Sequence, residues 1–89
     1  MKYNLQYTKR AQKDLLKMDK KQSKILVAKL HEYTKSNSPM SQAKPLKGEL
    51  AGLYRFRIGK YRAIFTTDKH GKIIIITIIH IAKRGEVYS

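Results

Sequence analysis

The chain has 89 residues, with 20 Lys plus Arg against 6 Asp plus Glu, which gives a formal net charge of +14. This length fits one small domain spanning residues 1–89, and the 42% of residues that are hydrophobic suffice for a folded core. The sequence contains no cysteine, which excludes disulfides, thiolate zinc sites and a cysteine nucleophile.

The first half of the chain is expected to form a strand followed by two helices. Apolar and polar residues alternate over residues 2–7, as in a strand with one buried face. Thr8 can cap one helix and Asp19 a second one. In both segments the apolar residues recur at helical spacing: Ala11, Leu15 and Met18, then Leu26, Leu30 and Tyr33. We expect a helical hairpin.

The second half is expected to form strands. Residues 36–48 break the periodic pattern, because Pro39 and Pro45 each disfavour a helical residue before them, and we predict a loop within the domain. Three strands separated by short turns follow, over residues 53–58, 61–67 and 72–81. The last strand is apolar on both faces, so it must be central or covered on both sides. The order β-α-α-β-β-β predicts an α+β fold, in which an N-terminal strand and an antiparallel three-strand meander pack against the helical hairpin.

The positive charge is spread over both halves of the chain, so it belongs to the folded body and not to a tail. A domain with an isoelectric point near 10.2 attracts polyanions through counterion release, which predicts nucleic acid or an acidic protein as partner. The N-terminus has no apolar signal segment, and no apolar run approaches the ~20 residues of a membrane helix. We therefore expect a soluble, cytoplasmic protein without membrane contact.

The residues that usually support catalysis are scarce. The six acids form no close pair in a candidate cleft, and the three histidines lie on different elements without metal-ligand spacing. Neither a metal nor another cofactor is expected. Arg55 and Arg57 stand two apart on a strand and share a sheet face. Arg62 begins the returning strand, and the hairpin register decides whether it shares that face.

A phosphate-binding surface follows from these residue types. Arg84 comes directly after the last strand, so we predict a concave face on which up to four guanidinium groups converge if the register brings Arg62 to it. Three tyrosines are available for base stacking, and two lysines stand beside the arginines: Tyr54, Tyr61 and Tyr88, with Lys60 and Lys83. The alternative interpretation is a solvated basic face, because alternating Arg also keeps exposed strands soluble.

Two segments of the chain resemble the RelE/ParE superfamily of type II toxins, and its RelE-like branch in particular. They are Leu46–Gly48 with Gly52–Phe65, and His80–Tyr88. Together with the element order and the length, the resemblance covers nearly the whole chain. It implies a RelE-like fold and a ribosome-dependent endoribonuclease that cuts messenger RNA in the decoding site without a metal ion.

The resemblance also implies roles for individual residues. Arg55 and Arg57 match basic residues that hold flanking phosphates, Arg62 and Arg84 match arginines that clamp the phosphate, and Tyr88 matches a C-terminal tyrosine. Tyr88 would act as general base or as a stacking platform. The nucleophile would be the 2′-hydroxyl of the RNA itself.

The sequence also departs from the pattern of the family. Arg55 and Arg57 stand where the best-known member has lysines, and Lys83 stands where many relatives have histidine. The donor of a proton to the leaving 5′-oxygen stays open between Lys83, Arg55 and the ribosome.

The resemblance implies partners as well. They are a cognate antitoxin that covers the basic face or completes the sheet and helix surface, and a ribosome with messenger RNA in its A site. The toxin–antitoxin complex would be hetero-oligomeric and would bind operator DNA through the antitoxin. Two alternatives stay open: a ParE-type poison of DNA gyrase without nuclease activity, and a basic nucleic-acid-binding module without toxicity.

Overall fold

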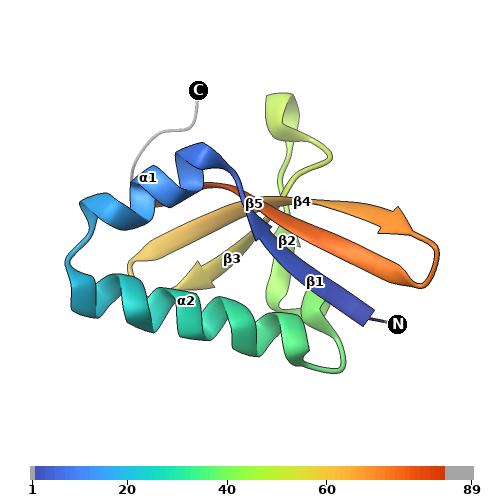
Figure 1. Cartoon of the computed structure of the whole chain (residues 1–89). Helices are drawn as coiled ribbons and strands as arrows, with labels where there is room; N and C mark the ends of the chain where they lie inside the picture. Colours follow the sequence, from blue (N-terminus) through green and yellow to red (C-terminus); the bar gives the residue numbers. More distant parts are fainter. Residues whose placement is uncertain (1, 84–89) are drawn as a thin grey trace.

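The computed structural model describes residues 2–83, which form a five-stranded sheet with a helical hairpin against it (Figure 1). Along the chain the elements are β1 (Lys2–Tyr7), α1 (Lys9–Lys17), α2 (Lys20–Lys35), η1 (Pro39–Gln42), β2 (Ala43–Pro45), η2 (Gly48–Leu50), β3 (Tyr54–Ile58), β4 (Tyr61–His70) and β5 (Ile73–Lys83). The strand, the two helices and the meander β3-β4-β5 confirm the predicted α+β class. Within this part of the chain, no helix is long and apolar enough to cross a bilayer.

The sheet has the strand order β1-β5-β4-β3-β2, with β5 between β1 and β4. β1 pairs with β5 in parallel, and the other neighbours are antiparallel. The central position of β5 confirms the prediction made from its two apolar faces. The predicted turn between β4 and β5 over residues 68–71 is wrong, because β4 continues to His70, which pairs with Ile73. The turn is the shorter Gly71-Lys72, where Gly71 takes a φ of +61°.

Thr8 joins β1, α1 and β5 at one point. Its Oγ1 accepts the N–H of Ala11 at 3.1 Å, as predicted for a helix cap, and donates to the carbonyl oxygen of Ile79 at 2.8 Å. Its own N–H donates to the carbonyl of Ile78 at 2.9 Å. Asp19 occupies the N-cap position of α2, but its side chain makes no capping hydrogen bond, so the capping role predicted for it is wrong.

The core lies between the sheet and α2. Phe56 of β3 and Phe65 of β4 are fully buried, and their ring centroids lie 4.3 Å apart. Tyr33 of α2 reaches Phe56 at 5.3 Å, and Leu26 and Leu30 of the same helix are fully buried. Aromatic pairs of this kind add about 0.5–1.5 kcal/mol beyond their buried area. This packing fixes which side of β3 faces the helices.

The segment predicted as a loop over residues 36–48 contains a short helix, η1, and an edge strand, β2. β2 pairs with β3, with Ala43 opposite Phe56 and Pro45 opposite Tyr54, and η1 precedes it. The prediction was wrong here because β2 is only three residues long and ends on a proline, which an edge strand tolerates. The strand is held by backbone pairing and leaves no periodic pattern in the sequence.

Candidate nucleic-acid interface

β3 divides its side chains between the two faces of the sheet. Phe56 and Ile58 are buried against the helices. Arg55 and Arg57 alternate with them, so both point to the face that the helices do not cover. The pair predicted from the sequence therefore lies on the open side of the sheet.

The register of β3 with its neighbours adds two further cations to this side. The Gly59-Lys60 turn, in which Gly59 takes a φ of +56°, places Arg57 directly opposite Arg62. On the other edge of β3, Lys44 of β2 lies opposite Arg55. Directly opposite residues share a face, so the open question about Arg62 is answered in favour of convergence. We call Lys44, Arg55, Arg57 and Arg62 the arginine face.

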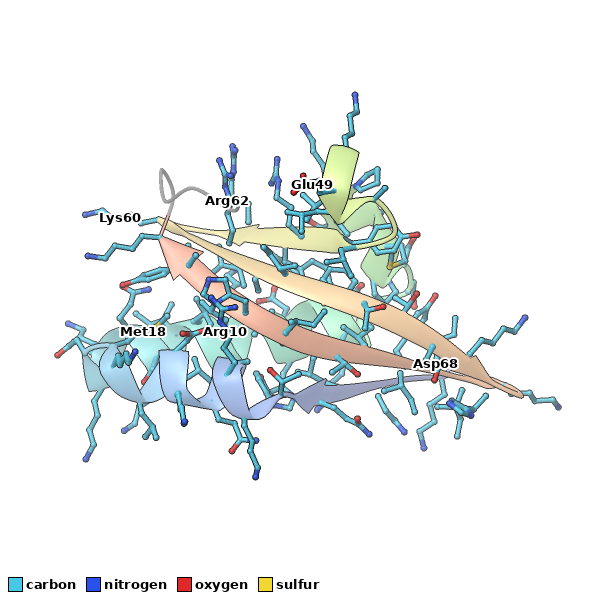
Figure 2. The ribbon with its side chains drawn as sticks, turned by 90° about the horizontal axis from the view of Figure 1, so that it is seen from above. Arg10, Met18, Glu49, Lys60, Arg62 and Asp68 are labelled. Carbon is cyan, nitrogen blue, oxygen red and sulfur yellow. The ribbon has the colours of Figure 1, made fainter. Side chains whose placement is uncertain are left out.

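Two members of the arginine face, Arg57 and Arg62, have no acidic partner among the described residues. Arg57 is exposed, and Nε of Arg62 is buried without a hydrogen-bond partner among the described residues. The ion pairs found within residues 2–83 involve Glu32, Asp68 and Asp14, and none of them includes Arg57 or Arg62. In Figure 2, Arg62 extends away from the helices. Because like charges opposite each other destabilise a sheet, an anion with several oxygens is the ligand that suits this surface.

The structure separates the predicted stacking rings from the arginines. Tyr54 lies opposite Phe65 and stacks on it at 5.7 Å, on the side of the sheet that faces the helices. Tyr61 packs against the same core, opposite Lys83. Tyr54, Tyr61 and Lys83 therefore lie on the face opposite the arginine face.

The other predicted residues lie at the end of the sheet or beyond it. Lys60 is exposed in the turn between β3 and β4, next to the arginine face. Arg84 and Tyr88 lie outside the described residues, so their convergence with Arg62 stays a prediction.

A β-bulge in β5 brings His80 to the side of the arginine face. Ile64 pairs with His80, but the next residue of β4 pairs with Ile78, so Ile79 has no residue opposite it. Without the extra residue, the alternation from the buried Ile78 would turn His80 toward the helices. With it, His80 lies opposite Ile64, on the side that bears Arg62.

Asp14 of α1 holds His80 in the part of β5 that extends beyond its pairing with β1. Its Oδ2 lies 2.7 Å from Nδ1 of His80 and accepts the N–H of Ile81 at 2.9 Å. Arg10, one helical turn earlier, places its Nη2 3.4 Å from Nε2 of His80, and Figure 2 shows Arg10 reaching from α1 toward β5. A cavity of about 670 Å³ lies beside these groups, and its lining includes Lys13, Lys17, Tyr61 and Lys83.

Sequence reasoning missed Lys44, Arg10 and Asp14 and treated His80 as a structural histidine. Lys44 sits in a strand without periodicity. Arg10 and Asp14 stand four apart, so they share a helical face, and that spacing is the signal that could have linked them. Nothing in the sequence marks the bulge that turns His80 outward.

Comparisons with known proteins agree with this fold. Residues 5–85 match the sequence model of a family described as ParE toxin of type II toxin-antitoxin system, parDE. Toxin RelG of Mycobacterium tuberculosis is 30% identical over 92 residues, which cover 99% of this chain and 98% of RelG. Toxin RelE of the same organism is 40% identical over 53 residues, 58% of this chain and 52% of RelE. The toxin-antitoxin complex RelBE2 of M. tuberculosis contains a chain that superposes with a TM-score of 0.69 and 26% identity, covering 94% of this chain and 100% of that one.

Proposed function

This chain belongs to the ParE toxin family, part of the RelE/ParE superfamily of type II toxins, and we propose that it is a RelE-like toxin that cleaves messenger RNA on the ribosome. The observation that supports this most is the arginine face, where Arg57 and Arg62 lie opposite each other with no acidic partner among the described residues. Such a surface suits a chain of phosphates. The similarity to toxin RelG over nearly the whole chain supports the same proposal.

The proposed chemistry asks little of the protein beyond positioning and charge. The 2′-hydroxyl of RNA attacks the adjacent phosphorus, so the enzyme has to align the attack and stabilise the charge that develops on the phosphate oxygens. Arg62 and Arg57 are the phosphate ligands in this proposal, because a guanidinium can give two parallel hydrogen bonds to phosphate and stays charged. Arg55 and Lys44 bind the flanking phosphates. For Arg84 and Tyr88, which lie outside the described residues, the proposal keeps the roles predicted from the sequence: Arg84 as a phosphate ligand and Tyr88 as the group that removes the proton of the 2′-hydroxyl.

The ribosome supplies the remaining geometry. The proposed site has no strong general base, so cleavage depends on RNA that is already held in line for attack. A free single strand is flexible and rarely takes that geometry, so naked RNA should be a poor substrate. We expect the purified protein to cleave messenger RNA within codons on programmed ribosomes, and to leave free RNA largely intact. Primer extension on a translation reaction tests this, and uncut message on ribosomes contradicts it.

Two matched variants sharpen the test. Arg62→Ala should slow cleavage by about 10²–10³-fold, as expected for loss of one preorganised donor at a developing oxyanion. Lys21→Ala removes an exposed cation from α2, on the covered side of the sheet, and should cleave like the wild type. Circular dichroism spectra that match the wild type serve as the control that both variants keep the fold. Equal cleavage rates for the two variants would contradict a role of the arginine face in the reaction.

A second candidate function is poisoning of DNA gyrase. The observation that favours it is the matching family description, which names ParE toxins. Expression would then induce DNA-damage signalling while messenger RNA stays intact, the reverse of the pattern expected for the nuclease. A gyrase cleavage assay together with primer extension separates the two functions.

We also propose that a cognate antitoxin silences the chain, because the similar M. tuberculosis chain was solved in a toxin-antitoxin complex. The surface that suits it is an apolar groove of about 540 Å³ between the two helices, lined by Gln12, Leu15, Leu16, Ser23, Lys24, Val27 and Ala28. Leu16 is 84% exposed there. Lys24 lines the groove and the chain carries a net charge of +14, so an amphipathic helix with acidic flanks is its expected occupant. The resulting hetero-oligomer would bind operator DNA through the antitoxin.

Co-expression with the product of a neighbouring short reading frame tests this partner. Leu16→Glu should abolish co-purification of the two chains, because a charge then faces the apolar side of the bound helix. Ile25→Glu is the control, since Ile25 is 48% exposed but does not line the groove. Equal co-purification of both variants would place the antitoxin on another surface.

A further inference from the structure

Asp14, His80 and Arg10 form a hydrogen-bonded chain that the chemistry described so far does not use. A carboxylate can only accept, so His80 donates through Nδ1 to Asp14 over 2.7 Å. The same carboxylate oxygen also accepts the N–H of Ile81, which ties Asp14 to the backbone of β5. The imidazole is thus fixed in orientation, with Nε2 directed to Arg10.

The ring is sheltered but within reach of a ligand. The side chains of His80 and Asp14 are 19% and 15% exposed, and both line the cavity of about 670 Å³ beside α1. A cavity of this size has room for a nucleotide. Arg62 is the diagonal neighbour of His80 across the β4–β5 pair, and such neighbours lie about 7–8 Å apart, within reach of a long side chain.

We propose that His80 donates the proton to the leaving 5′-oxygen of the RNA, with Asp14 as its positioning residue and Arg10 as a further phosphate ligand. This inference rests on the proposed ribonuclease function. In the free protein Nη2 of Arg10 lies 3.4 Å from Nε2 of His80. A bound phosphodiester takes over that guanidinium by charge-assisted hydrogen bonds, and Nε2 then faces the leaving 5′-oxygen.

The step balances in atoms and electrons. The 2′-hydroxyl gives its proton to the general base of the proposed reaction, and its oxygen attacks phosphorus. The bond between phosphorus and the 5′-oxygen breaks, and the proton on Nε2 of His80 moves to that oxygen, so one proton is taken up and one is released. The products are a 2′,3′-cyclic phosphate and a 5′-hydroxyl, and the ring regains a proton from water. Among the described residues, Asp14 and Arg10 of α1 contact the ring, and Arg62 of β4 is its diagonal neighbour. Other charged residues line the cavity beside it: Lys13, Lys17, Asp19 and Lys83.

A 5′-bridging phosphorothiolate tests this role, because sulfur leaves as a thiolate without protonation. Programmed ribosomes are given messenger RNA with either oxygen or sulfur at the scissile 5′-position. His80→Ala should cut the oxygen substrate about 10²–10⁴-fold more slowly than the wild type, and the sulfur substrate within about tenfold of it. Asp14→Asn keeps an oxygen for the Ile81 N–H and should show the same rescue to a smaller extent, which a merely structural defect would not produce.

The chain offers a matched control in a second histidine–aspartate pair. His70 and Asp68 lie 2.8 Å apart in the β4–β5 hairpin, but both are more than half exposed, and His70→Ala should cut both substrates like the wild type. Equal rates of wild type and His80→Ala on the oxygen substrate would overturn the inference. Loss of both activities in a natively folded His80→Ala would also overturn it. If the wild type cuts neither substrate, the proposed function fails as a whole.

Discussion

Arg57 and Arg62 face each other across the β3–β4 pair, and this arrangement costs stability when no anion is bound. Arg57→Thr should raise the free energy of unfolding by about 0.2–1 kcal/mol, because it removes the repulsion and introduces a residue that favours strands. The same change should reduce RNA cleavage. Thermal denaturation with and without an RNA oligonucleotide measures both effects, since bound RNA should raise the Tm of the wild type more than that of the variant. A less stable variant would contradict this account.

Tyr7 is a second residue with a polar group that has no hydrogen-bond partner within residues 2–83. Its hydroxyl is buried without a hydrogen bond among the described residues, and burial raises the pKa of Tyr7 above its ordinary value of 10.0. Tyr7→Phe keeps the ring and removes the unsatisfied group, so the free energy of unfolding should rise by about 1 kcal/mol at neutral pH.

The pH dependence gives a separate test at Tyr7. The unfolded chain releases the phenolic proton before the folded one does, so this group lowers the stability of the wild type as the pH rises above about 10. Tyr7→Phe lacks this contribution. Urea denaturation at about pH 8 and about pH 10.5 should therefore show a larger gap between variant and wild type at the higher pH. A constant gap would show that Tyr7 ionises equally in both states.

At the scale of elements, Thr8 connects the start of α1 to the bulge in β5. Thr8→Val removes the cap of α1 and the bond to the Ile79 carbonyl, and should cost about 1–2 kcal/mol of stability. Thr8→Ser keeps the hydroxyl and should stay within about 0.5 kcal/mol of the wild type. Because the bulge presents His80 to the site, Thr8→Val should also slow cleavage more than Thr8→Ser. Urea denaturation and the cleavage assay measure the two effects, and equal behaviour of the two variants would contradict the connection.

The elements also show what sequence patterns can and cannot predict. Periodic segments were predictable, because burial on one face repeats every two or 3.6 residues, as in residues 2–7 and in both helices. β2 and the bulge at Ile79 were not, because they depend on backbone pairing between distant segments. The arginine pair of β3 followed from alternation alone, whereas the place of Arg62 needed the register. The link from Asp14 to His80 joins residues 66 positions apart, and only the folded chain reveals it.

At the scale of the whole molecule, the net charge of +14 makes RNA affinity strongly dependent on salt. For single-stranded RNA the slope of log Kd against log salt changes by about 0.7 for each phosphate contact. The double variant that combines Arg57→Ala and Arg62→Ala loses two phosphate contacts, so its slope of log Kd against log salt should be lower by about 1.4. Replacement of Lys20 and Lys21 should leave it unchanged, because they belong to α2, which packs on the other face of the sheet. Fluorescence anisotropy of a labelled RNA across a salt series gives both slopes, and an equal loss in the two variants would mean that binding is diffuse.

The interior strand β5 is also the last described element to be synthesised. β5 joins β1 to β4, so until residues 73–83 emerge from the ribosome the first strand has no partner in the sheet. Pairing between such distant segments forms late in folding. The sheet therefore closes only after nearly all of the described chain has been synthesised, and His80 meets Asp14 only at that stage.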